Sequence, residues 1–125
     1  MGNMVKINSY AGPKTILIAP ELAFSIPVIV TNTGIGADTN GRKIIKAGTP
    51  IGGETNVLLN RQTALIKDET NAQGILLHNV DVTEGETNAT MLVSGYVDLT
   101  RIETDTVPSE IVQNKLNRIV FMKGE

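Results

Sequence analysis

Short aliphatic segments separated by turn residues constrain the fold of this chain more than any other feature. Residues 72–83 (AQGILLHNVDVT) and 89–102 (ATMLVSGYVDLTRI) are rich in Ile, Val and Leu, and the TEGET sequence between them is typical of a turn. Segments of this length and composition, bounded by Gly, Asn, Asp and Thr, indicate β-strands. The sequence therefore predicts two long strands joined as a hairpin, with Gly95 marking a bulge or a close backbone contact in the second.

The remaining segments predict one long loop and several shorter strands. Residues 31–41 (TNTGIGADTNG) are expected to form a long loop, because they are rich in glycine and end in Asn-Gly, a strong signal for a tight turn. The shorter strands are expected at 14–18, 27–32, 42–48 and 118–122, with weaker candidates at 56–60 and 63–67.

The segment from Asp105 to Arg118 predicts a helix. Asp105 or Thr106 can act as the N-cap, and Pro108 falls in the first turn, where proline is tolerated. A helix of about two to three turns is expected. The apolar residues that fall on one side at helical spacing are Ile111, Val112, Leu116 and Ile119.

Composition decides what kind of core these elements can build. Of the 125 residues, 41% are hydrophobic, but only two are Phe and two are Tyr, and Trp and Cys are absent. The core must therefore be aliphatic, and disulfides and cysteine-based metal sites are excluded. A chain of this length can bury one core without covalent cross-links. The lack of cysteine and of a recognisable signal peptide fits synthesis in a reducing cytoplasm.

Proline spacing divides the chain into two parts. Pro13, Pro20 and Pro27 recur every seven residues, and proline cannot donate a backbone hydrogen bond to a sheet. We therefore expect residues 1–25 to be an extended N-terminal arm and residues 26–125 to be a β-rich domain.

Many short strands with one late helix predict a mainly β fold, namely a small antiparallel β-barrel or sandwich with one short C-terminal helix.

Charge and hydropathy argue against nucleic-acid and membrane partners. The net charge is −2, and the basic residues are scattered rather than gathered in a stripe with interleaved aromatic residues. The longest apolar runs, such as IPVIV and GILL, are too short to cross a bilayer.

The glycine-rich loop does not have the pattern of a nucleotide site. Gly34 and Gly36 supply the first two glycines of a G-x-G-x-x-G motif, but Thr39 occupies the third position. The loop also leads into another predicted strand, whereas a dinucleotide-binding turn opens a helix whose amides hold the phosphates. We expect a surface loop and no bound cofactor.

His78 is the only histidine of the chain. In a continuous strand it would share a face with Leu76 and Val80 and would point away from Asp81. A zinc site needs three or four protein ligands, and no GxSxG motif marks a catalytic serine. We therefore expect no catalytic or metal-binding residue, and we interpret His78 as a packing or subunit-contact residue.

The order of segments carries a resemblance to a known family. GRKIIKAGTPIGG (41–53) is followed by AQGILLHNVDVTEGETNATMLVSGYVDLTRI (72–102) and then by VPSEIVQNKLNRIVFMKGE (107–125). This order resembles the head decoration proteins of tailed bacteriophages, the lambda gpD-like capsid-stabilising family. The resemblance covers about residues 42–122. It rests on the sequences and order of the strand and turn segments and involves no catalytic residues.

The resemblance implies a β-tulip-like fold and a virion structural protein that is not an enzyme. It implies a homotrimer on the outer surface of the expanded head, where the protein binds the major capsid protein and stabilises the shell. It also implies synthesis in the cytoplasm of a bacterial host and an N-terminal arm that contacts the capsid. The arm residues suited to that contact are Val5, Ile7, Tyr10, Ile16, Leu17 and Ile18.

Two alternatives remain open at this stage. Another phage module, such as a head fibre or a tail-associated β-module, fits the same composition and differs in its partner. A small ligand-binding or enzymatic barrel that uses His78 and nearby acids is the other reading. Loss of a bound metal or of an activity on changing His78→Gln would favour that reading.

Overall fold

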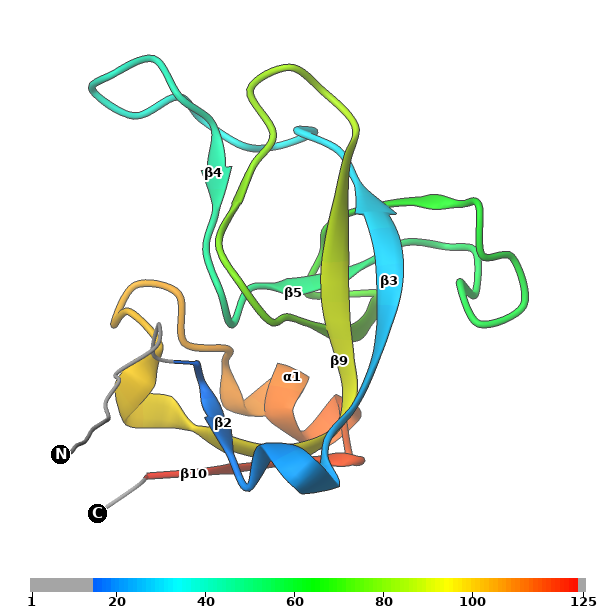
Figure 1. Cartoon of the computed structure of the whole chain (residues 1–125), viewed down its shortest axis with the longest axis vertical. Coiled ribbons are helices and arrows are strands. Elements are labelled where there is room, and N and C mark those ends of the chain that lie inside the picture. The colour runs from blue at the N-terminus through cyan, green and yellow to red at the C-terminus, as the bar shows by residue number, and fades with distance from the viewer. Residues whose placement is uncertain (1–14, 124–125) are drawn as a thin grey trace, which may run out of the picture.

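The computed structural model describes residues 15–123, and most of its elements are short strands (Figure 1). The strands are β2 (Leu17–Ile18), β3 (Phe24–Val30), β4 (Ile44–Ile45), β5 (Pro50–Gly52), β6 (Ala64–Lys67), β7 (Ala72–Leu76), β8 (Val80–Asp81), β9 (Thr87–Asp98) and β10 (Ile119–Met122). The helical elements are the 3-10 turns η2 (Pro20–Leu22) and η3 (Leu99–Arg101) and the α-helix α1 (Glu110–Lys115). The expected mainly β fold with a short C-terminal helix is confirmed.

Five strands close into a barrel. Their order is β9–β3–β6–β5–β7, and β7 pairs back onto β9. Most pairings are antiparallel, but β3 lies parallel to β6, with Ile29 opposite Ala64, and β10 lies parallel to β9. The predicted barrel is therefore confirmed, although its strands are mixed in direction. Strands β4 and β8 form a separate two-stranded sheet.

Strand β9 is long enough to belong to two layers of the fold. Its first part pairs with β3, as far as Ser94. Its last part, from Gly95 to Asp98, pairs with β10 and also with β2. Gly95 has a φ of 148°, and a Cβ on it would approach the Cα of Ala23 to 3.3 Å. The expected close backbone contact at Gly95 is thus present at the point where β9 passes from the barrel wall into a smaller sheet (Figure 1).

Side-chain alternation on β7 and β9 separates two hydrophobic cores. Leu76 and Met91 face the barrel interior, whereas their neighbours Ile75 and Leu92 face a second core that includes residues of α1 and β10. Both cores are built from Ile, Val, Leu and Met, as the composition requires. The barrel core contains Ile26, Val28, Val30, Ile45, Ile51, Val57, Leu65, Leu76, Val82 and Met91. The second core contains Ile16, Leu17, Ile75, Leu77, Leu92, Val97, Ile102, Val112, Leu116 and Ile119.

Gly74 lies where β7 approaches β9 most closely. A Cβ at this position would lie 2.4 Å from the carbonyl oxygen of Leu92 and 2.7 Å from Cγ of Met91. A close-packed interior has no room to absorb such a contact without moving the β9 backbone. The absence of a side chain at Gly74 is therefore a condition for closing the barrel.

The predicted continuous strand over 72–83 is wrong. Strand β7 ends at Leu76, residues 77–79 bend, and β8 pairs with β4 rather than extending the pairing with β9. The bend is held by tertiary hydrogen bonds, because the backbone N–H of Leu77 donates to the carbonyl of Thr90 and the Asn79 side chain accepts from the N–H of Ala47. The two long strands therefore do not form a simple hairpin.

The segment at 56–60 is a turn rather than a strand. The Oδ1 atom of Asn56 accepts a hydrogen bond of 2.9 Å from the N–H of Leu58, and the carbonyl of Asn56 accepts from the N–H of Leu59 and of Asn60. An asparagine that bonds its own following backbone favours a turn over an extended ladder.

Helix α1 is shorter and starts later than expected. Ser109 is the N-cap, and its hydroxyl accepts a hydrogen bond from the N–H of Val112. Proline disfavours helical backbone in the residue that precedes it, so Val107 is a poor helical residue. The helix therefore starts after Pro108, which lies just before the cap. Val112 and Leu116 are buried as expected, but Ile111 is 76% exposed, so its placement on the buried side of the helix is wrong.

The folded body begins earlier in the chain than the expected boundary at residues 25–26. Ile16 and Leu17 are 3% and 7% exposed and belong to the second core, and Ile18 pairs with Tyr96 of β9. The guanidinium of Arg101 donates to the carbonyls of Thr15 and Leu17. Residues 16–25 are therefore part of the folded body, and the predicted arm over residues 1–25 is too long at its C-terminal end.

A substitution at Gly74 tests the closure of the barrel. We expect Gly74→Ala to lower the free energy of unfolding by about 1–3 kcal/mol, because the added methyl group overpacks the β7–β9 contact. The matched control is Gly36→Ala, where a Cβ meets nothing within 4 Å and a change below about 1 kcal/mol is expected. Urea denaturation measures both values, and equal stabilities for the two variants would contradict this account of closure.

Candidate functional site

The small sheet formed by β2, the end of β9 and β10 carries an apolar row on its outer face. Tyr96 lies directly opposite Ile18 on one side and Val120 on the other. Residues directly opposite in neighbouring strands point to the same face. The next row, in which Leu17, Val97 and Phe121 are opposite one another, points inward to the second core.

Further apolar side chains extend this outer row. Met122 lies two residues beyond Val120 on the same strand, and Phe24, at the start of β3 opposite Ser94, is also exposed. Tyr96 is 39% exposed and Val120 is 45% exposed. We call this surface the apolar sheet face. It comprises Ile18, Tyr96, Val120 and Met122, and the exposed side chains of Leu22 and Phe24 follow β2 along the chain.

The sequence of β10 contains a signal for the apolar sheet face. Strand β10 reads IVFM, so residues on both of its faces are apolar. A strand with one solvated face normally alternates apolar and polar residues, and a continuous apolar run is typical of a strand covered on both faces.

The beginning of the described chain lies next to this face. Thr15 is three residues before Ile18, and Arg101 fixes the backbone of this segment through the carbonyls of Thr15 and Leu17, at 3.3 and 3.1 Å. Arg101 is itself held by Asp98, whose Oδ2 lies 3.3 Å from the Arg101 Nε. The described chain therefore begins beside the apolar sheet face, and β2 and β10 lie at the same end of the molecule (Figure 1).

The predicted arm contacts divide into three groups. Ile16 and Leu17 are core residues, so their assignment as surface contacts is corrected. Ile18 is partly exposed and belongs to the apolar sheet face. The remaining three, Val5, Ile7 and Tyr10, lie outside the described residues.

His78 lies in the bend after β7 and is exposed. It lines a hollow of about 340 Å³ together with Lys46, Arg101 and Glu103. His78 and Asp81 do not share one strand, because the chain bends at residues 77–79 and Asp81 belongs to β8. The expected separation onto opposite faces of one strand therefore does not apply, and Asp81 is also exposed. Among residues 15–123, no three His, Cys, Asp or Glu side chains gather in a group that could hold a metal ion. The role of His78 at a subunit contact stays a prediction.

The glycine-rich loop runs through residues 31–43 and leads into strand β4, as expected. Within it, Oδ1 of Asp38 accepts hydrogen bonds from the N–H groups of Asn40 and Arg42, at 2.8 and 3.0 Å. This carboxylate thus serves the turn at Asn40–Gly41. In the described part of the chain, no helix is long and apolar enough to cross a membrane.

Asp81 belongs to a polar cluster that joins β8 to the segment before β4. The hydroxyl and N–H of Thr83 and then the guanidinium of Arg42 lower the pKa of Asp81 to about 2. The N–H of Thr83 donates to Oδ1 of Asp81 at 2.9 Å, and Nε of Arg42 donates to Oδ2 at 2.8 Å. This arrangement supports the strand pair, since the hydroxyl of Thr83 also accepts from the N–H of Lys43.

Comparison with known proteins gives no match to a protein-family model, to a curated protein or to a solved structure.

The Asp81 cluster gives a pH-dependent prediction. Because the pKa of Asp81 is lower in the folded protein (about 2) than its ordinary value of 3.8, its carboxylate stabilises the fold above about pH 4. That contribution is lost as the pH falls through the folded-state value. A carbon-detected NMR titration should place the Asp81 midpoint near 2, and Thr83→Val should move it upward, because the hydroxyl is the largest cause of the shift. A midpoint of 3.8 in the unsubstituted protein would refute this arrangement; Glu84→Gln is the neighbouring control.

Proposed function

We propose that this chain is a structural protein of a tailed-bacteriophage virion, a head decoration protein that binds the outer surface of the expanded capsid and stabilises it. The order of segments resembles that family, and the mainly β barrel agrees with the fold class that the resemblance implies. The partner would be the major capsid protein. The protein would be made in the cytoplasm of the bacterial host and would act without catalysis.

The observation that carries the proposal is the apolar sheet face, which lies beside Thr15, where the described chain begins. Contiguous exposed apolar surface on a small protein is typical of a protein–protein contact. Tyr96, at its centre beside Val120, is a large aromatic side chain, and tyrosine is enriched among the residues that form the energetic centre of interfaces. Residues 1–14 contain Lys6 and Lys14 and no acidic residue, so this segment favours an acidic surface on the partner.

The proposed stabilisation follows from binding physics. A segment that adds a strand to a neighbouring sheet binds through backbone hydrogen bonds and needs no special side chains. A trimer that engages three capsid sites gains avidity from effective concentration, so that each contact can be weak. A protein that binds the expanded shell better than the disrupted shell raises the stability of the shell by linkage.

Co-sedimentation with expanded phage shells that lack decoration tests this function. The purified protein should co-sediment, and Tyr96→Glu should weaken binding by at least about tenfold, because it places a charge in the centre of an apolar contact. Deletion of residues 2–14 should also weaken binding while preserving the fold, since Ile16 and Leu17 are retained in the core. The control is Asn88→Glu, which adds the same charge to an exposed position at the other end of β9.

Thermal melts of each variant separate loss of binding from loss of fold. Binding by the Tyr96→Glu variant at the level of the unsubstituted protein would remove the apolar sheet face from the proposal. No binding of the unsubstituted protein to shells would contradict the decoration function. Binding to isolated tails instead would support the tail-associated alternative.

The proposed oligomer gives a separate prediction. Native mass spectrometry of the purified protein should show a species of about 40 kDa, three times the 13.4 kDa of one chain. The trimer is the form proposed to bind the shell, where several weak contacts act together. Protein eluted from shells should therefore give the same mass. A monomer in both samples would contradict the trimer.

A further inference from the structure

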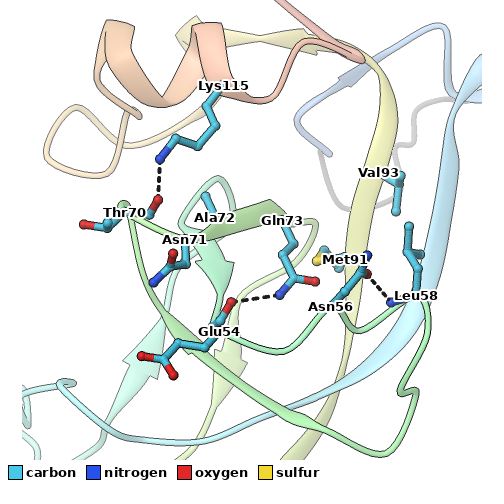
Figure 2. Close-up of a pocket in the computed structure, with 11 residues that line it drawn as sticks. Glu54, Asn56, Leu58, Thr70, Asn71, Ala72, Gln73, Met91, Val93 and Lys115 are labelled. Carbon is cyan, nitrogen blue, oxygen red and sulfur yellow. Dashed lines mark hydrogen bonds between the residues drawn. The ribbon is translucent and has the colours of Figure 1, made fainter.

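A groove lies on the side of the molecule between the turn at residues 53–58 and the end of α1. It consists of two adjoining hollows of about 450 and 270 Å³. Both are lined by Leu58, Ala72, Gln73, Val93 and Lys115, so they form one continuous depression. Figure 2 shows the larger hollow, with Lys115 on one side and Leu58 on the other.

The groove has an apolar floor and firmly held walls. Ala72 and Val93 contribute to the floor, from strands β7 and β9, together with Met91, whose side chain is 1% exposed and lies mainly in the barrel core. The amide nitrogen of Gln73 donates to the carbonyls of Gly53 and Thr55, at 3.2 and 2.7 Å, and its amide oxygen accepts from the N–H of Val57 at 2.8 Å. One side chain thus ties the 53–58 wall to the floor, and the groove is preformed.

Two exposed apolar side chains, Leu59 and Ile111, lie near residues that line the groove, although neither of them lines a hollow itself. Leu58 lines the groove, and its neighbour Leu59 is 79% exposed at the apex of the turn that Asn56 holds. On the opposite wall, Ile111 is 76% exposed and lies one helical turn before Lys115, on the same side of α1. A small ligand inside the groove would leave Leu59 and Ile111 in water, whereas a protein segment lying across the rim would cover them.

The α1 wall is positively charged. Lys115 lines both hollows and Arg118 lines the smaller one, and both residues are exposed. Neither forms an ion pair with an acidic side chain within residues 15–123. Lys115 donates one hydrogen bond to the carbonyl of Thr70 (Figure 2), which leaves further donors on its ammonium group. Glu54 lines only the larger hollow, whereas Arg118 lines only the smaller one.

We propose that this groove binds an extended segment of a partner protein in which apolar side chains lie next to carboxylates. The apolar residues would lie on the floor and between Leu59 and Ile111, and the carboxylates would pair with Lys115 and Arg118. The N-terminal segment of this chain does not suit the groove, because residues 1–14 carry Lys6 and Lys14 and no acid. The groove therefore goes beyond the proposed function, and its partner need not be the capsid protein.

Synthetic peptides test the groove on the full chain. The probe is acetyl-GSLVLDEG-amide, and its charge-reversed counterpart is acetyl-GSLVLKKG-amide. In two-dimensional NMR titrations, the acidic peptide should shift the amide signals of Ala72, Gln73 and Val93. It should bind at least about tenfold more tightly than the basic peptide, because the charge complementarity is reversed. Lys115→Glu should reverse the preference, and the control Lys67→Glu, which changes an exposed lysine of β6, should leave it unchanged.

Three outcomes would overturn the proposal. The first is equal binding of the two peptides, and the second is a set of shifted signals away from the groove. The third is octanoate binding as tightly as the acidic peptide, which would make the groove a small-molecule carboxylate site. The readout is independent of shell co-sedimentation, so a failure here leaves the decoration function standing, and a failure to bind shells leaves the groove standing.

Discussion

The approach of β7 to β9 at Gly74 is the contact on which the rest of the structure depends. It closes the barrel, because β7 joins the last free edge of the sheet to β9. It also fixes the alternation that sends Leu76 and Met91 into the barrel and Ile75 and Leu92 into the second core. A slip of one residue between these strands would exchange the two sets of side chains.

The second consequence of this contact is that β9 continues past the barrel. Beyond Gly95 it becomes the middle strand of a small sheet, with β2 and β10 on its two sides. The inner face of that sheet packs on the second core, and its outer face carries the apolar residues that we propose bind the shell. The two candidate surfaces, the apolar sheet face and the groove, are both built on β9, because Tyr96 belongs to one and Val93 to the other.

Local sequence reasoning succeeded where one segment carries its own signal. The loop predicted over 31–41, the final strand predicted over 118–122 and the close contact predicted at Gly95 are all present, the strand as Ile119–Met122. It failed where a distant partner decides. The bend at residues 77–79 is held by Ala47 and Thr90, and the start of the body at Ile16 is fixed by Arg101, which lies far along the chain. Proline spacing alone could not locate that boundary.

The sequence by itself determined that this chain folds into short strands around aliphatic cores, since its apolar residues are β-branched or aliphatic and its turns are rich in Gly, Asn and Thr. Only the tertiary structure decided which apolar side chains remain on the surface. Val120 and Phe121 are adjacent and both apolar, yet Val120 faces solvent and Phe121 packs against the second core. The physical reason is that a residue's face in a strand depends on register with its neighbours, and β10 takes its register from β9.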